Sequence, residues 1–187
     1  MGHGLKKPGC DRPDTIRRLH HEFSGRFIHK YAMLFDFPTQ AHTFAVAEIS
    51  RGHRKTDLFD PAEYPEALPL ENGNTLRLPY LAALIRLADE IDWAADRNSS
   101  LLYDLSDYID ASEIDFRIFS THEAIRTIRT EPEAFTLCVC TDEAWVLEEV
   151  RRLMGKMQET LDYCRSVVSQ RTPFSISQTA VRMERIT

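Results

Sequence analysis

Apolar residues recur every three or four positions in the first half of the chain, which is the pattern of amphipathic helices. We expect a first helix from Pro13 to about Phe35, because an apolar stripe runs through it. The stripe consists of Ile16, Leu19, Phe23, Phe27, Tyr31 and Leu34. A second helix is expected between Pro38 and Gly52, since glycine readily adopts the left-handed conformation that ends a helix.

A third helix is expected from about Pro79 to Trp93, in the run "PYLAALIRLADEIDW". Before it, residues 54–76 contain three prolines and an Asn-Gly pair without a sustained period, which predicts a long loop. Loops of this length inside compact domains tend to serve a site or to be mobile.

The pattern changes to a period of two in the second half, after a short helix expected at about 112–120. The stretch "AIRTIRTEPEAFTLCVCT" predicts a hairpin with strands at Ile125–Arg129 and Phe135–Cys140. A long amphipathic helix is expected from about Asp142 to Ser169, and "FSISQTAVRMERI" predicts a last strand that pairs with the hairpin.

These elements predict a mainly α protein with an α+β C-terminal part, in which a small antiparallel sheet is covered by a long helix. At 187 residues, one main domain is expected. We expect a leader over residues 1–12, a helical domain over 13–110 and an α+β extension packed on it over 111–187.

Composition narrows the classes of function. The net charge of −6 argues against broad electrostatic binding to nucleic acid. No apolar run approaches the roughly 20 residues of a membrane span, and no secretory signal opens the chain, so a cytoplasmic protein that does not bind membranes is expected. The four cysteines form no CxxC pair and are expected to be free thiols.

Three predicted helices each carry a side chain that could bind a metal ion. His20 and His21 lie in the middle of the first helix, His53 follows the end of the second, and Asp89 lies late in the third. Helical metal sites are assembled from facing helices in this way. Imidazole nitrogen together with carboxylate oxygen suits Zn, Mn or Fe.

Each of these residues also has a plainer explanation. Of the two adjacent histidines, one could be solvated and the other could lie at the edge of the core. His53 could bind the last carbonyls of its helix. Asp89 could pair with Arg86 or Arg97. Local spacing does not decide between the explanations, and only the order of the whole set favours a functional site.

Three segments resemble a known family. The segments "RLHHEFSGRFI", "AEISRGHRKTDL" and "LAALIRLADEIDWAADR" are similar to the later part of an HD-superfamily domain, the helical metal-dependent phosphohydrolases. The likeness covers about Pro13 to Arg97 and is greatest to the divergent branch found beside heat-shock-chaperone-type ATPase domains. The HD domain of exopolyphosphatases is somewhat similar.

The resemblance implies a ligand set and a cofactor. In that family an early histidine, a His-Asp pair and a late aspartate hold a metal, and intervening histidines bind a second metal or the substrate phosphate. Asp89 would match the late aspartate, His20 or His21 the histidine after the pair, and His53 the next one. Ser24 and Arg97 would be structural companions. The implied cofactor is a divalent metal: Mn, Fe, Zn or Mg.

The resemblance also implies roles and partners. His53 and Asp89 would be catalytic, the first by binding phosphate or moving a proton, while Arg54 and Lys55 would steady the charge on phosphate oxygens. The expected substrate is a nucleotide or another phosphorylated small molecule, and an ATPase-type domain is an expected partner.

One departure from the family limits this interpretation: the sequence contains no His-Asp dipeptide. Either the chain begins partway through the domain, or it is a relative that has lost its metal and serves as a regulatory or interaction module. An unrelated helical domain with a chance likeness is a third explanation. Helices missing at the N-terminus would favour association, so a homodimer is also expected.

Overall fold

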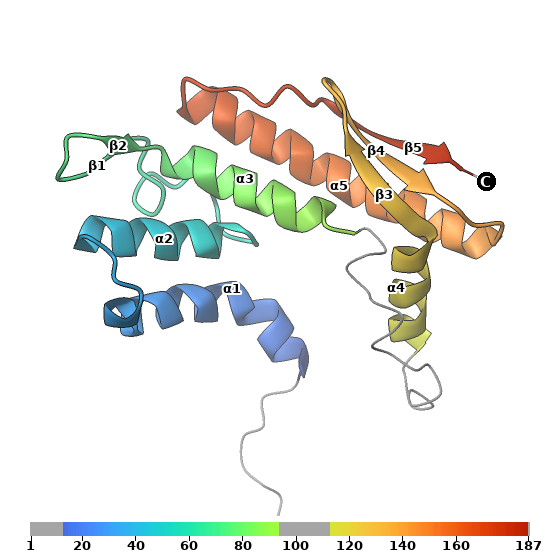
Figure 1. The fold of residues 1–187 in the computed structure, drawn as a ribbon, viewed down its shortest axis with the longest axis horizontal. Coiled ribbons are helices and arrows are strands. Elements are labelled where there is room, and N and C mark those ends of the chain that lie inside the picture. Colours follow the sequence, from blue (N-terminus) through green and yellow to red (C-terminus); the bar gives the residue numbers. More distant parts are fainter. Residues whose placement is uncertain (1–12, 94–112, 187) are drawn as a thin grey trace, which may run out of the picture.

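The computed structural model describes residues 13–93 and 113–186 of the chain. The predicted leader over residues 1–12 and Arg97 lie outside them. Helix α1 (Pro13–Lys30), the short 3-10 helix η1 (Ala32–Leu34), α2 (Gln40–Gly52) and α3 (Leu78–Ile91) make up the helical part, in which α1, α2 and α3 lie successively side by side (Figure 1). The first three predicted helices are therefore confirmed.

The first helix ends earlier than predicted. It stops at Lys30, and η1 and a turn follow, so that α2 can return alongside α1. Phe37 precedes Pro38, and the helical conformation is disfavoured for a residue before proline. This limits how far the first helix could extend toward its C-terminal end.

The loop predicted for residues 54–76 contains a small hairpin that the sequence pattern did not predict. Strand β1 (Leu68–Pro69) pairs antiparallel with β2 (Thr75–Leu76), and Gly73 adopts a positive φ of 81° in the turn between them. Leu58 and Tyr64 of the same loop are fully buried. The loop is thus part of the packed core.

The C-terminal part contains α4 (Glu113–Ala124), β3 (Ile125–Thr130), β4 (Ala134–Val139), α5 (Ala144–Arg171) and β5 (Ala180–Arg185). The strand order is β3-β4-β5, and β3 and β4 form the predicted antiparallel hairpin.

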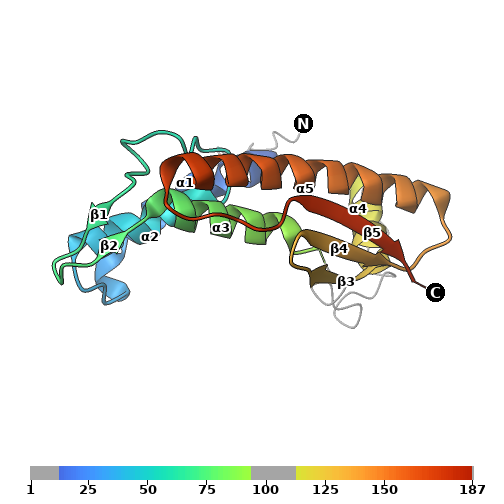
Figure 2. The same ribbon diagram turned by 90° about the horizontal axis from the view of Figure 1, so that it is seen from above.

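The sheet is mixed, whereas a purely antiparallel sheet was predicted. Strand β5 pairs parallel to β4, because α5 carries the chain back to the end of the sheet at which β4 began. Figure 2 shows α5 lying along the sheet and continuing beside α3, so the predicted cover of the sheet by a long helix is confirmed.

Two hydrophobic clusters form the core, and α5 contributes to both. Leu161 and Val168 pack with Ala82, Leu87 and the rest of the helical part. Val150 and Met157, nearer the start of α5, pack with the inner face of the sheet. None of the described helices combines the length and the apolar character needed to cross a membrane.

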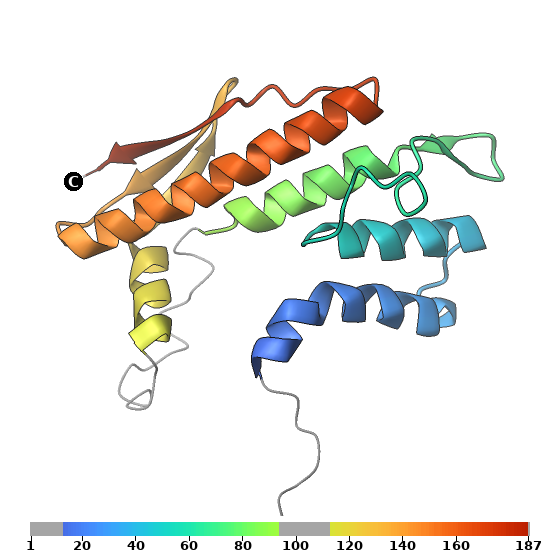
Figure 3. The same ribbon diagram turned by 180° about the vertical axis from the view of Figure 1, so that it is seen from behind.

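Helix α1 turns its apolar stripe away from the core. Ile16, Phe23 and Phe27 are 51%, 40% and 54% exposed, whereas His21 and Gly25 are buried against α2. Figure 3 shows α1 at the outer edge of the helical part, seen from behind. The polar face of α1 therefore makes the contact with α2, and this contact forms the site described next.

Candidate functional site

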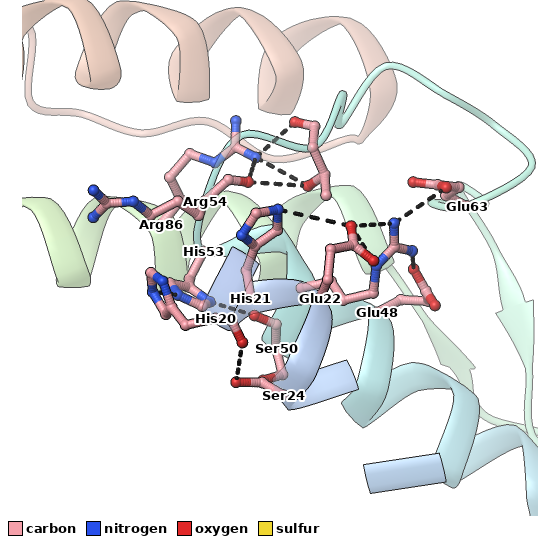
Figure 4. A network of polar contacts seen from close by, with 12 residues as sticks. His20, His21, Glu22, Ser24, Glu48, Ser50, His53, Arg54, Glu63 and Arg86 are labelled. Carbon is pink, nitrogen blue, oxygen red and sulfur yellow. Dashed lines mark hydrogen bonds and ion pairs between the residues drawn. The ribbon is translucent and has the colours of Figure 1, made fainter. Parts of the chain in front are cut away.

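Two histidines from neighbouring helices contact each other. The Nε2 atoms of His20, on α1, and His53, after the end of α2, are 2.8 Å apart (Figure 4). The Nδ1 of His53 also contacts the Ser50 carbonyl, which can only accept a hydrogen bond. His53 Nδ1 is therefore the donor, and in the neutral ring Nε2 carries the lone pair. It follows that His20 Nε2–H donates to His53.

His21 is the third imidazole of this cluster. It is 6% exposed, and its ring lies edge-on to both His20 and His53, with centroid distances of 6.0 and 6.3 Å. Burial lowers the pKa of His21, and the Glu22 carboxylate, 3.7 Å from its Nε2, only partly offsets that effect. His21 Nδ1 has no hydrogen-bond partner among the described residues. A neutral His21 is therefore favoured.

An arginine network holds α1 against α2 beside the histidines. Arg51 donates to Glu22 of α1 at 3.0 Å, to Glu48 of its own helix and to Glu63 of the following loop at 3.3 Å. Burial alone would lower the pKa of Arg51, but the bond to Glu22 and the charges of Glu48 and Glu63 raise it overall. A Cβ at Gly25 would come within 2.6 Å of the Arg51 side chain, so glycine leaves room for it.

A second arginine fixes the turn that carries His53 and Arg54. Arg86, on α3, donates to the carbonyls of Gly52, Arg54 and Thr56, each at 2.7 Å. Its guanidinium lies 5.0 Å from the centre of the Tyr163 ring on α5. The end of α2 is thus held by α3, and indirectly by α5.

A cleft of about 650 Å³ opens beside His53, between the helical part and the sheet. Asp89 and Asp92, from the end of α3, line it together with His53, and β3 adds the hydroxyls of Thr127 and Thr130. The cleft therefore presents an imidazole, carboxylates and hydroxyl groups.

A smaller cleft of about 280 Å³ also has His53 in its wall and carries most of the nearby positive charge. Arg54, Lys55 and Lys156 line it, and Lys156 pairs with Glu90 at 2.7 Å. The Nη1 of Arg54 lies 4.0 Å from Asp89 Oδ2. Glu90 and Glu159 also line this smaller cleft, so His53 stands between a cleft with two aspartates and one in which cations outnumber glutamates.

The structure brings some of the predicted site residues together but does not assemble them into one metal-binding group. His20, His21 and His53 come together, and Asp89 lines the same cleft as His53 and lies near Arg54. Within residues 13–93 and 113–186, no group of three or more His, Cys, Asp and Glu side chains is placed to hold a metal ion.

Several residues of the site were not predicted from the sequence. Arg86 was considered only as an ion-pair partner of Asp89, but its guanidinium bonds backbone carbonyls instead. A charged residue inside the apolar run "LAALIRLA" was the available signal, because a charge in a packed helix needs partners. Thr127 and Thr130 gave no signal, since their position depends on how the sheet packs.

A comparison with family models places most of the chain in one family. The HD-CE model matches residues 6–173. No curated protein and no solved structure matches the chain.

Proposed function

The chain belongs to the HD-CE family and contains an HD-type domain, and from this we propose that it is a divergent HD-type phosphohydrolase acting on a nucleotide or another phosphoester. The observation that carries the proposal is that His53, which contacts His20, lines two clefts with Arg54 and Asp89 beside it. The finer likeness, to the branch found beside chaperone-type ATPase domains, is proposed with it.

We assign proton transfer to His53. Its bond to the Ser50 carbonyl makes Nε2 the basic nitrogen of the ring, and Nε2 can accept a proton from an attacking water once the hydrogen bond from His20 is released. Asp89, close to Arg54, would orient that guanidinium toward the substrate.

Arg54 and Lys55 are assigned to the phosphate group. Both line the cation-rich cleft next to His53, and Arg54 is half-buried while Lys55 is exposed. Arginine binds phosphate oxygens with two parallel hydrogen bonds, and positive charge stabilises the negative charge that builds up during hydrolysis. The Arg86 bonds to the backbone would keep both side chains in place.

The histidine pair offers part of a metal site. A first-row metal binds imidazole nitrogen at about 2.0–2.1 Å, so two neighbouring nitrogen ligands of one ion lie about 3 Å apart. The 2.8 Å between the Nε2 atoms of His20 and His53 is close to that distance. A complete set needs at least one more ligand than the described residues bring to this point. The roles proposed above therefore rest on the side chains alone, and Asp89 and His21 remain proposed ligands.

A second candidate function is a non-catalytic regulatory or interaction module that retains the phosphate-binding cleft. The incomplete ligand set among the described residues favours it. The two candidates differ in turnover, whereas both predict that phosphate binding depends on Arg54.

The test combines hydrolysis with phosphate binding. The purified chain is assayed with p-nitrophenyl phosphate and its bis-ester, in EDTA and with added Mn²⁺ or Zn²⁺. His53→Ala is expected to lower the rate by about 10²- to 10⁴-fold, because general acid–base groups contribute that much. His29→Ala, which changes an exposed histidine of α1, is the control and should keep the rate.

Calorimetric titration with inorganic phosphate separates the outcomes. Turnover that is lost in His53→Ala supports the hydrolase. Absence of turnover under every condition, with phosphate binding that Arg54→Ala weakens, overturns the hydrolase and supports the module. If phosphate does not bind and no ester is cleaved, both candidates are wrong.

A further inference from the structure

A cleft of about 330 Å³ lies between the second half of α5 and the segment that follows this helix. Figure 2 shows that segment, residues 172–179, returning alongside α5 toward β5. The walls are mostly polar and consist of Asp162, Arg165, Ser166 and Ser169 on α5, with Ser175 and Ile176 on the segment. None of these residues lines either cleft beside His53, so this cleft is a separate feature of the molecule.

Arg165 is the residue of this cleft that lacks a partner. It is half-buried, and its Nε is shielded from solvent without a hydrogen-bond partner among the described residues. No carboxylate of the described residues lies within ion-pairing distance of its guanidinium. A donor of a charged group that is withdrawn from water without an acceptor is unfavourable. Arg165 is therefore placed to receive a negatively charged group of a ligand.

Asp162 brings a negative charge to the same cleft. It precedes Arg165 by three residues on α5, so the Cβ atoms of the two residues lie about 5–6 Å apart on one side of the helix. The Oδ1 of Asp162 accepts from the side-chain amide of Gln158 at 3.0 Å, and the same amide donates to the Thr179 carbonyl at 3.1 Å. Gln158 thus holds the Asp162 carboxylate in place, while its Oδ2 can accept from a ligand.

The serine hydroxyls of α5 can bind both donors and acceptors. The Oγ of Ser166 accepts from the side-chain amide of Gln170 at 2.8 Å, so the hydroxyl proton of Ser166 is available to a ligand oxygen. The Oγ of Ser169 donates to the Ser166 carbonyl at 3.1 Å, which leaves its lone pairs available to a ligand N–H. The cleft therefore offers a hydroxyl donor and a hydroxyl acceptor in addition to its two opposite charges.

We propose that this cleft binds a free α-amino acid with a small uncharged side chain, whose carboxylate pairs with Arg165 and whose ammonium group pairs with Asp162. A simple anion fits less well because Asp162 repels it, and a simple cation fits less well because Arg165 repels it. A zwitterion matches both charges. No other charged side chain lines the cleft to receive a charged ligand side chain, whereas Ile176 offers an apolar contact.

The size of the cleft and its exposure to water set the expected affinity. Its volume is at the lower end of the roughly 300–1,000 Å³ typical of ligand sites, which favours a small ligand. Asp162 and two of the serines are exposed, so solvent screens the charges. We therefore expect a dissociation constant of about 0.1 to 1 mM. This inference does not depend on the proposed function.

Calorimetric titration of the full chain with L-alanine tests the proposal. Acetate and methylammonium, which each carry one of the two charges, should bind about tenfold more weakly or not at all. Arg165→Gln and Asp162→Asn each remove one charge of the cleft and should weaken L-alanine binding by about tenfold, since each hydrogen bond to a charged group contributes at least that much. Arg151→Gln makes the same change at an exposed position of α5 outside the cleft and should keep the affinity. Circular dichroism checks that each variant is folded.

Other results would overturn the proposal. If the wild-type chain does not bind L-alanine, or if Arg165→Gln or Asp162→Asn binds it as tightly as the wild type, the cleft is not an amino-acid site. Acetate or inorganic phosphate that binds as tightly as L-alanine and depends on Arg165 would mean a simple anion site. Arg54→Ala, which is expected to weaken phosphate binding beside His53, should leave L-alanine binding unchanged, so the two sites are tested separately.

Discussion

One backbone hydrogen bond decides the chemistry available to His53. Because the Nδ1–H of His53 donates to the Ser50 carbonyl, the Nε2 of His53 is an acceptor and faces His20. The structure shows the first of the two explanations that the sequence allowed for His53, because Nδ1 binds a carbonyl in the last turn of α2, while the functional role of its Nε2 stays a prediction. The position of His53 in the sequence cannot distinguish the two explanations, because each uses a different nitrogen of the same ring.

His21 gives a prediction about pH. Its pKa in the folded protein is lowered by burial, so the unfolded state takes up its proton first as the pH falls. Neutral His21 contributes to the free energy of unfolding at pH values above the pKa of about 6.5 that it has in the unfolded state. This contribution is lost as the pH falls toward the lower pKa of the folded state. We expect urea unfolding free energies of the wild type to fall more steeply from pH 7.5 to about pH 5 than those of His21→Gln.

The comparison of the two proteins cancels the titrations that they share. Burial raises the pKa of Glu48, so at acidic pH this group changes the unfolding free energy with pH in the opposite direction to His21. It does so in both the wild type and His21→Gln. Equal slopes for wild type and His21→Gln would mean that His21 is not neutral in the folded state.

At the scale of elements, α2 and α3 approach closely where the site is built. A Cβ added at Gly52 would lie 2.6 Å from the Cβ of Ala82. Gly52 does end α2, as the sequence predicted, but the predicted left-handed conformation is wrong, because Gly73 is the only described glycine with a positive φ. The close approach to α3 is the reason for glycine that the structure shows. That reason depends on packing between helices and could not be read from local pattern.

Gly52→Ala should destabilise the protein by about 1–3 kcal/mol, because neither backbone nor Cβ can move aside easily. Ala82→Gly should cost about 1 kcal/mol through helix propensity. The loss of stability in the double variant should then be smaller than the sum of the losses in the two single variants. Thermal or urea unfolding measures all three losses. Gly155→Ala is the matched control: nothing lies within 4 Å of its added Cβ, so a gain of about 0.5–1 kcal/mol is expected. Strict additivity in the double variant would contradict the close contact.

The elements themselves were largely predictable, and their orientation was not. Periodicity predicted the helices and the β3–β4 hairpin, because side-chain spacing follows backbone geometry. It could not predict that β5 pairs parallel to β4, since that depends on the path of α5. Likewise the stripe containing Phe23 and Phe27 predicted a helix without indicating whether the core or another surface receives it.

For the whole molecule, α5 is the element that connects the two clusters of the core. Its first half covers the sheet and its second half packs on α3. The sequence predicted a helical domain over residues 13–110 and an extension over 111–187. Because one continuous helix is buried in both clusters, we expect the two parts to unfold together.

Leu161→Ala tests this coupling. Leu161 is fully buried in the cluster of the helical part, so its truncation should cost about 2–5 kcal/mol. Both tryptophans, Trp93 and Trp145, pack against the other cluster. If the chain unfolds as one unit, the urea midpoint reported by tryptophan fluorescence should fall as far as the midpoint reported by circular dichroism. A fluorescence midpoint that stays at the wild-type value would instead mean that the sheet and its part of α5 unfold independently of the helices.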